Sequence, residues 1–172
     1  MELEEVFEKR FSARRYNDRK VEKEKLEEIL NAGRIAPTAC NNQPQRFLIV
    51  ESEEAIQKLD SVTAMRYGAP CVIIVCSDMN EVWHSRYEEG YTTSDMDISI
   101  ATTYMMLKAT ELGLGTVWVR AFNSSEVKKV FGLPDNMKPV CMMPIGYKAE
   151  DCKPNENFHF SRNQLEDEVE YL

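Results

Sequence analysis

The feature of the sequence that most constrains its fold is the apolar run Cys71–Cys76, in which every residue is hydrophobic. A strand with one face in water alternates apolar and polar residues, so a run without alternation predicts a strand covered on both faces. The run is far too short to cross a membrane as a helix, which needs about 20 apolar residues. The sequence therefore predicts a central strand here.

Apolar residues at helical spacing predict several helices. The longest is expected from Ser94 or Asp95 to Gly113, and it is apolar on more than one face, which indicates burial on two sides in a core or an interface. The others are a helix ending near Arg10, one over 26–33, one over 53–59 capped by Ser52, one over 125–131 capped by Ser124, and one around 164–171.

Further strands are expected over 46–50, 116–121 and 137–147. Strands separated by helices imply a helix–sheet–helix layering, from which the order of the strands in the sheet does not follow. A length of 172 residues suits a single domain, 1–172, and no repeat or flexible linker divides it. The segment 79–93 is polar and aromatic without a clear period, and we expect an excursion there.

The distribution of charge favours a small anionic partner. The formal net charge is −8, which argues against nucleic-acid binding because phosphate backbones favour a basic surface. Five basic residues nevertheless fall within 10–20. Such a cluster in an acidic chain is typical either of a site for a small anion or of a solvated positive face.

The cysteines and the N-terminus indicate a cytoplasmic protein. Five cysteines, an odd number without a Cys-x-x-Cys pair, predict reduced and mostly buried thiols. The acidic start has no signal-peptide core, and no membrane segment is expected. His84 and His159 stand apart from any ligand cluster, so we expect no metal site.

Two segments carry side chains suited to binding. In Arg10–Arg14, forked guanidinium groups flank Ser12, and guanidinium groups bind phosphate oxygens in bidentate fashion. In Ala36–Pro44, two prolines hold a loop whose side-chain amides can read the edge of a heteroaromatic ring. The alternative for this loop is a turn whose asparagines satisfy themselves.

Several common mechanisms are excluded by their missing motifs. The segment Gly113–Trp118 lacks the third glycine of a dinucleotide fingerprint and follows a helix instead of preceding one. No Gly-x-Ser-x-Gly elbow and no Walker-type loop is present. With no evident catalytic residue, the sequence is typical of a protein whose cofactor performs the chemistry.

Taken in order along the chain, these segments resemble the FMN-dependent nitroreductase family. The motifs that carry the resemblance are Arg10-x-Ser12-x-Arg14-x-Tyr16, Ala36-Pro37-Thr38-x-x-Asn41-x-Gln43-Pro44 followed by Phe47, Gly68-Ala69-Pro70, Asp97, Leu112-Gly113-Leu114-Gly115-Thr116, Pro144-Ile145-Gly146-Tyr147 and Arg162. Two departures are Gln45, where the family often has an aromatic residue, and a chain at the short end of the family.

The resemblance implies an α+β fold, a three-layer helix–sheet–helix sandwich with a mixed or antiparallel central sheet, and a homodimer with two equivalent flavin sites. The implied FMN-binding residues are Arg10, Ser12, Arg14 and Arg162 at the phosphate and ribityl end, Pro37, Thr38, Ala39, Asn41 and Gln43 from the other subunit, and backbone groups around Val117, Trp118 and Val119 along the ring.

The implied reaction is a ping-pong transfer of electrons from NADH or NADPH through FMN to a nitroaromatic, a quinone or a similar small acceptor. Two alternatives stay open. One is a related flavin enzyme of the dehalogenating or flavin-fragmenting type, and the other is a flavin-binding or redox-sensing module without turnover. The segment 82–93 lies where the substrate-covering parts of the family vary.

Overall fold

The apolar run forms the middle of a four-stranded antiparallel sheet in the computed structural model, which describes all residues from Met1 to Leu172. The strands are β1 (Gln45–Val50), β2 (Cys71–Asp78), β3 (Gly115–Thr116) and β4 (Met137–Gly146), in the order β1-β2-β4-β3. All three pairs are antiparallel. Residues 71–77 of β2 are all buried, and the predicted central strand is confirmed.

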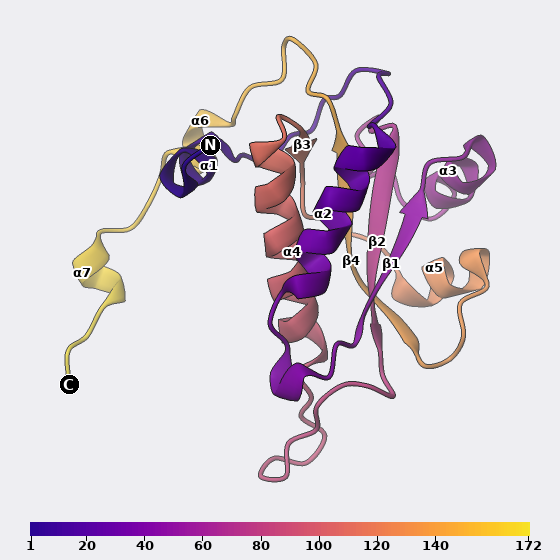
Figure 1. Cartoon of the computed structure of the whole chain (residues 1–172), viewed down its shortest axis with the longest axis vertical. Coiled ribbons are helices and arrows are strands. Elements are labelled where there is room, and N and C mark those ends of the chain that lie inside the picture. The colour runs from indigo at the N-terminus through magenta and orange to yellow at the C-terminus, as the bar shows by residue number, and fades with distance from the viewer.

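Helices cover both faces of this sheet (Figure 1). On one side lie α2 (Lys23–Ile35) and α4 (Ser94–Glu111), and on the other lie α3 (Glu53–Asp60) and α5 (Ser124–Phe131). Successive residues of β2 point to opposite faces, so Ile73 packs with the α2–α4 core and Ile74 with the α3–α5 core. The predicted α+β sandwich of three layers is confirmed.

The N-termini of α3 and α5 show which of the predicted capping side chains bond to the helix. Ser52 caps α3 as predicted, because its side chain accepts from the Ala55 N–H at 3.2 Å. The predicted cap of α5 is wrong by one residue. Asn123 accepts from the N–H groups of Ser125 and Glu126, whereas the Ser124 hydroxyl donates to the Pro139 carbonyl of β4 at 3.0 Å.

The strand predicted over 116–121 is also too long, because regular pairing in β3 stops at Thr116. The reason lies on β4, where Pro144 has no N–H to return a hydrogen bond. The Val117 N–H donates to the Pro144 carbonyl at 3.4 Å without reciprocation. Paired bonding resumes only at Val119, which exchanges two bonds of 2.9 Å with Met142.

Three buried thiols lie in the sheet. Burial raises the pKa of Cys71, Cys76 and Cys141 to about 12 in each case, so these thiols stay protonated and inert at neutral pH. Cys152 is half-buried, whereas Cys40 is exposed, and all five are free. The prediction of mostly buried thiols is confirmed for the three cysteines of the sheet and is wrong for Cys40.

The chain ends lie outside the three layers. Near the N-terminus, α1 (Leu3–Lys9) packs beside α6 (Glu156–His159), and the last residues run away from the body through α7 (Leu165–Glu168) (Figure 1). The sequence predicted one helix around 164–171, so α6 was missed and α7 is shorter. No helix of the structure combines the length and the apolar character that a membrane span requires.

Candidate functional site

Residues 10–14 form an extended segment along the outer edge of β3. The Ala13 N–H donates to the Thr116 carbonyl at 2.9 Å, and Ser12 and Thr116 form a parallel bridge. Side chains alternate along an extended chain, so Ala13, which is fully buried, faces the core. The alternation turns Arg10, Ser12 and Arg14 toward the opposite side, which is what the spacing Arg-x-Ser-x-Arg requires.

These three side chains and Arg162 line one pocket of about 140 Å³. None of the three arginines forms an ion pair, and no acidic residue lines the pocket. Arg14 donates only to the Ser12 carbonyl, at 3.3 Å, while Arg162 donates only to carbonyls of its own segment. In a chain with a net charge of −8, three guanidinium groups without a carboxylate partner in one pocket form a candidate anion site.

Four further residues of this pocket were not predicted from the sequence: Phe11, Asn155, Phe158 and His159. Asn155 caps the missed helix α6 by accepting from the Asn157 N–H at 3.1 Å. Because α6 is short, it has no apolar period that would reveal it. The asparagine that caps α6 was the available signal for this helix, whereas the edge-on contact of the His159 and Phe11 rings, with centroids 6.2 Å apart, arises only in the tertiary fold.

Ala13, which bonds the segment 10–14 to β3, is closely packed. A Cβ at Gly115 would stand 2.8 Å from the Ala13 Cβ and 2.6 Å from the Lys148 Cγ, so only glycine permits this approach. The Tyr16 hydroxyl donates to the Ala13 carbonyl at 2.8 Å, and burial raises the pKa of this phenol. Tyr16 therefore stays neutral and fixes the turn behind Arg14.

The chain that follows β3 has backbone groups without hydrogen-bond partners at the edge of the sheet. Trp118 makes no backbone hydrogen bond, because it lies between Val117 and Val119, which bond to β4, and in an antiparallel pair its own N–H and C=O point away from that strand. The side chains of Val117 and Val119 are buried in the α3–α5 core. A free N–H and C=O at this edge can bond to a ligand that lies along it.

The loop before β1 holds an unusual backbone. Cys40, Asn41 and Gln43 all have positive φ angles, of 51°, 55° and 54°, around the 3-10 turn η1 (Ala39–Asn41). Such a conformation costs about 1–3 kcal/mol for each residue other than glycine and persists only where its surroundings fix it. Here the Gln43 N–H donates to the Thr38 hydroxyl at 3.0 Å, closing the loop.

The side-chain amides of Gln43 and Asn41 in this loop differ in their hydrogen bonding. The Gln43 amide donates to the Asn41 carbonyl at 3.1 Å, as in a self-satisfied turn. The amide of Asn41 has no partner within the chain and is exposed, so it is available to a ligand. The Gln43 amide is therefore used within the turn, whereas the Asn41 amide is left free.

Beneath the loop, the side chains that follow Pro44 make polar contacts. Gln45 is buried and its amide donates to the Arg34 carbonyl at 3.4 Å, while its Oε1 has no partner within the chain. Arg46 donates to the Gln43 carbonyl at 2.9 Å and is paired with Asp78 at 3.2 Å. The base of the loop is therefore fixed to the end of β2.

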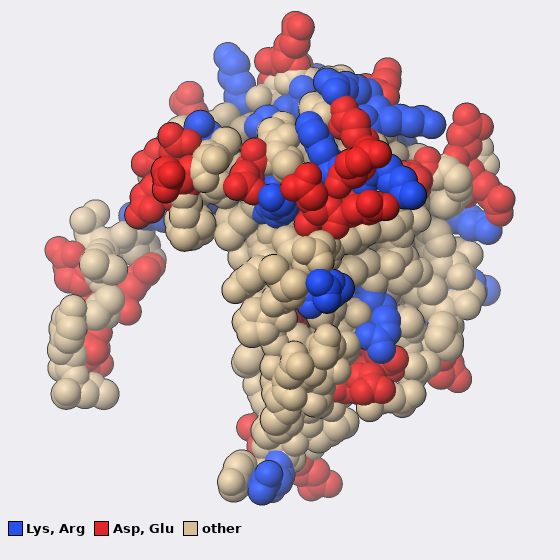
Figure 2. Space-filling view, viewed as in Figure 1, with Lys and Arg blue, Asp and Glu red and all other residues tan.

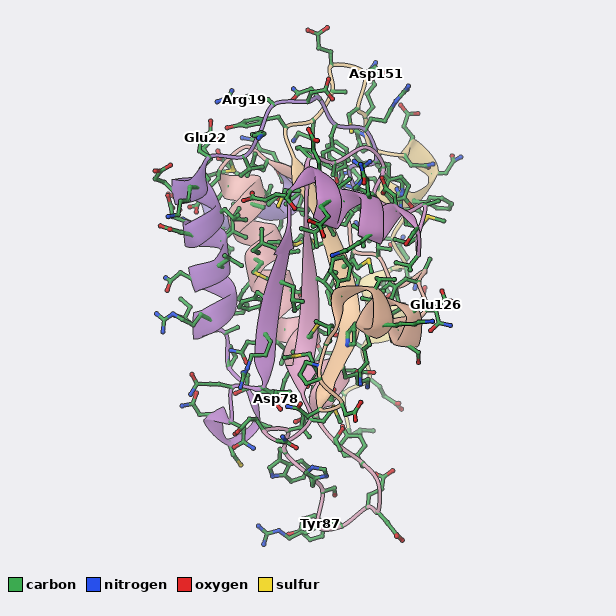
Figure 3. All side chains as sticks on the ribbon, turned by 90° about the vertical axis from the view of Figure 1, so that its right-hand side faces the viewer. Arg19, Glu22, Asp78, Tyr87, Glu126 and Asp151 are labelled. Atoms are coloured by element: carbon green, nitrogen blue, oxygen red, sulfur yellow. The ribbon has the colours of Figure 1, made fainter.

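Within one chain, the anion pocket and this loop lie at opposite ends of the sandwich. The loop meets the start of α4, where the Ala39 N–H donates to Asp97, whereas the pocket borders β3, which follows the end of α4. The 18 residues of α4 span about 27 Å. Figure 3 shows the same separation, with Asp78 at the loop end of the sheet and Asp151 at the other.

The fold is an α+β sandwich, and the arginine-lined pocket has the charge that a small phosphate-bearing ligand requires. The nitroreductase family profile matches residues 7–67 and 63–147, and the chain belongs to the nitroreductase family. The resemblance stated from the sequence is confirmed.

A protein of Methanothermobacter thermautotrophicus, provisionally named an NADH dehydrogenase/NAD(P)H nitroreductase, is 32% identical over 96% of this chain and 87% of its own length. A nitroreductase family protein from Clostridium difficile 630 has a solved structure with a TM-score of 0.91 and 44% identity, covering 99% of this chain and 98% of its own. The FMN reductase [NAD(P)H] of Bacillus subtilis is 27% identical over 81% of this chain and 63% of its own length.

Proposed function

We propose that the chain binds FMN at two equivalent sites of a homodimer and passes electrons by a ping-pong mechanism to a nitroaromatic, a quinone or a similar small acceptor. As a nitroreductase family member, it is an NAD(P)H-dependent oxidoreductase with FMN as its cofactor. The observation that carries the proposal is the pocket with three arginines and no carboxylate, which suits one phosphate group.

Each part of the site would hold a different part of FMN. The guanidinium groups of Arg10, Arg14 and Arg162 would bind the phosphate, and Ser12 would add a hydroxyl. The free N–H and C=O of Trp118 would face the ring, whereas both backbone groups of Val119 and the N–H of Val117 are bonded to β4. When bound, FMN accepts two electrons from the nicotinamide and delivers them to the acceptor.

The loop would complete the site from the second chain. Pro37, Thr38, Ala39, Asn41 and Gln43 are the residues that we expect to approach the ring, with the unpaired Asn41 amide reading its polar edge. Because α4 separates this loop from the pocket of its own chain by about 27 Å, one flavin does not contact both in a single chain. A partner chain that supplies the loop resolves this separation.

The surface of the chain supports such a partner. In Figure 2 the charged residues gather over the upper end of the molecule, whereas the lower part of this face is mostly uncharged. On α4, Met96 and Tyr104 are exposed, and in the last residues the exposed fractions of Leu165 and Tyr171 are 72% and 95%. Apolar surface of this extent is typical of an interface between subunits.

The experiment that tests the proposed function identifies the flavin and its turnover. We expect the purified protein to be yellow and to release FMN on denaturation, because the pocket suits one phosphate and no dinucleotide fingerprint is present. Anaerobic addition of NADH or NADPH should bleach the flavin, and a nitroaromatic or quinone should restore its colour. Release of FAD, or no binding of added FMN, would overturn the cofactor assignment, and bleaching without reoxidation by any acceptor would favour a module without turnover.

Gly115→Ala is expected to weaken FMN binding about tenfold and to lower the free energy of unfolding by about 1–3 kcal/mol, as overpacking does. The added methyl group would push Ala13, and with it Ser12 and Arg14, off the edge of β3. Flavin titration and thermal unfolding of the apoprotein measure the two effects. The double variant Gly115→Ala/Ala13→Gly exchanges the two Cβ positions and should recover much of the affinity. Unchanged affinity in the single variant would contradict this packing argument.

A further inference from the structure

At the start of α4, the carboxylate of Asp97 is almost fully enclosed, with 2% of the residue exposed. It forms no ion pair with a lysine or arginine. Its two oxygens instead accept from two separate segments, Oδ1 from the Ala39 N–H at 2.9 Å and Oδ2 from the Thr93 hydroxyl at 2.7 Å. A buried carboxyl group is costly unless it is hydrogen-bonded, and here each oxygen has one partner.

The first of these segments is the loop that we propose to face the flavin. Ala39 immediately precedes the left-handed residues Cys40 and Asn41, so the bond to Asp97 fixes the loop where its unusual backbone begins. The far end is fixed separately, by Arg46 at the Gln43 carbonyl. Without the Asp97 contact, the strained part of the loop is tied to the rest of the molecule on one side only.

The second segment is the base of the excursion over 79–93. The Thr93 N–H donates to the Trp83 carbonyl at 3.1 Å, and the Ser85 N–H donates to the Tyr91 carbonyl at 3.0 Å, which makes 83–93 a hairpin. Figure 1 shows this hairpin extending from the same end of the molecule as the start of α4. One carboxylate therefore joins the loop and the hairpin to the helix.

We propose that Asp97 is a positioning residue that holds the loop 38–43 in its ligand-binding conformation and sets the hairpin 83–93 beside it. It acts through the Ala39 N–H and the Thr93 hydroxyl and touches neither cofactor nor acceptor. The inference rests on the flavin-facing role of the loop proposed above. One side chain thus fixes both the start of the strained part of the loop and the base of the hairpin.

The test compares Asp97→Ala, Asp97→Asn and the control Asp95→Ala. Asp95 lies in the same helical turn and carries the same charge, but its partner is Lys138, at 2.7 Å on the surface. In the apoprotein, amide hydrogen exchange at Ala39, referenced to amides of β2, reports the loop directly. Titration with FMN reports affinity, and visible circular dichroism of the bound flavin reports its surroundings.

We expect Asp97→Ala to speed exchange at Ala39 at least about tenfold and to weaken FMN binding roughly ten- to a hundredfold, as loss of a charged hydrogen-bonding group does. Asp97→Asn keeps an acceptor for the Ala39 N–H and should fall between this variant and the wild type. Asp95→Ala should stay within about twofold of the wild type in both measurements. The circular dichroism of bound flavin should change in Asp97→Ala and not in the control.

A second pair of variants keeps the proposal testable if Asp97→Ala does not fold. Thr93→Val removes the hydroxyl that Asp97 accepts from, whereas Thr93→Ser retains it, so affinity should fall in the first and recover in the second. If amide exchange at Ala39 is equally fast in Asp97→Asn, Thr93→Val and Asp95→Ala, the positioning role is overturned. This holds whether or not the affinity for FMN changes. If the wild type binds no FMN while exchange still responds to Asp97, the proposed function fails, and the positioning role for a flavin fails with it.

Discussion

Replacing Arg14 with alanine is expected to weaken FMN binding by roughly ten- to a hundredfold, the usual effect of losing a charged hydrogen-bonding partner. The guanidinium group is exposed, bonds only to the Ser12 carbonyl and lies over the Tyr67 ring at 5.9 Å, so no carboxylate of the chain neutralises it. Its charge is therefore free for a phosphate, and its removal should cost the fold little. Thermal unfolding of the apoprotein checks the fold, since bound ligand itself stabilises the native state.

The neighbouring arginine provides a matched control. Arg15 pairs with Asp151 at 2.8 Å on the surface and does not line the pocket, so Arg15→Ala removes the same charge at almost the same place. Its effect on the dissociation constant of FMN should stay within about twofold, because exposed ion pairs contribute little. Equal effects of the two substitutions would indicate a diffuse electrostatic attraction. An unchanged constant in Arg14→Ala would restore the interpretation of a solvated positive face.

Local patterns were sufficient to predict most of the fold. The absence of alternation over 71–76 identified the central strand, because burial on both faces leaves no position for a polar residue. The errors have non-local causes. Pairing near Val117 is broken by a proline on the neighbouring strand, and Ser124 cannot cap its helix because its hydroxyl is bonded to β4.

The candidate site was predictable to the extent that its residues follow one another in sequence. The spacing of Arg10, Ser12 and Arg14 encodes a shared side of an extended segment, whereas Arg162 reaches the same pocket only through the tertiary fold. The left-handed loop was not foreseen, because Cys40 and Gln43 seldom adopt positive φ angles. The contact of Asp97 with Ala39 joins residues 58 positions apart, which no local pattern reveals.

Mixing two variants with impaired flavin binding, each poorly active alone, is expected to restore activity if each flavin site is shared between chains. Arg14→Ala damages the pocket and Asn41→Ala damages the loop, and the two lesions lie at opposite ends of one chain. In a heterodimer of the two variants, one site carries both lesions and the other carries neither. With free exchange of subunits, about a quarter of all sites are then intact, although each variant alone has none.

The rate of NAD(P)H oxidation by the mixture, measured after native mass spectrometry has established that heterodimers are present, tests the shared site most directly. The predicted result is recovery to about a quarter of the wild-type rate, since half of the dimers are mixed and each has one intact site. Mixtures that contain heterodimers yet stay as inactive as the separate variants would contradict the account. That outcome would mean that every site draws its pocket and its loop from a single chain.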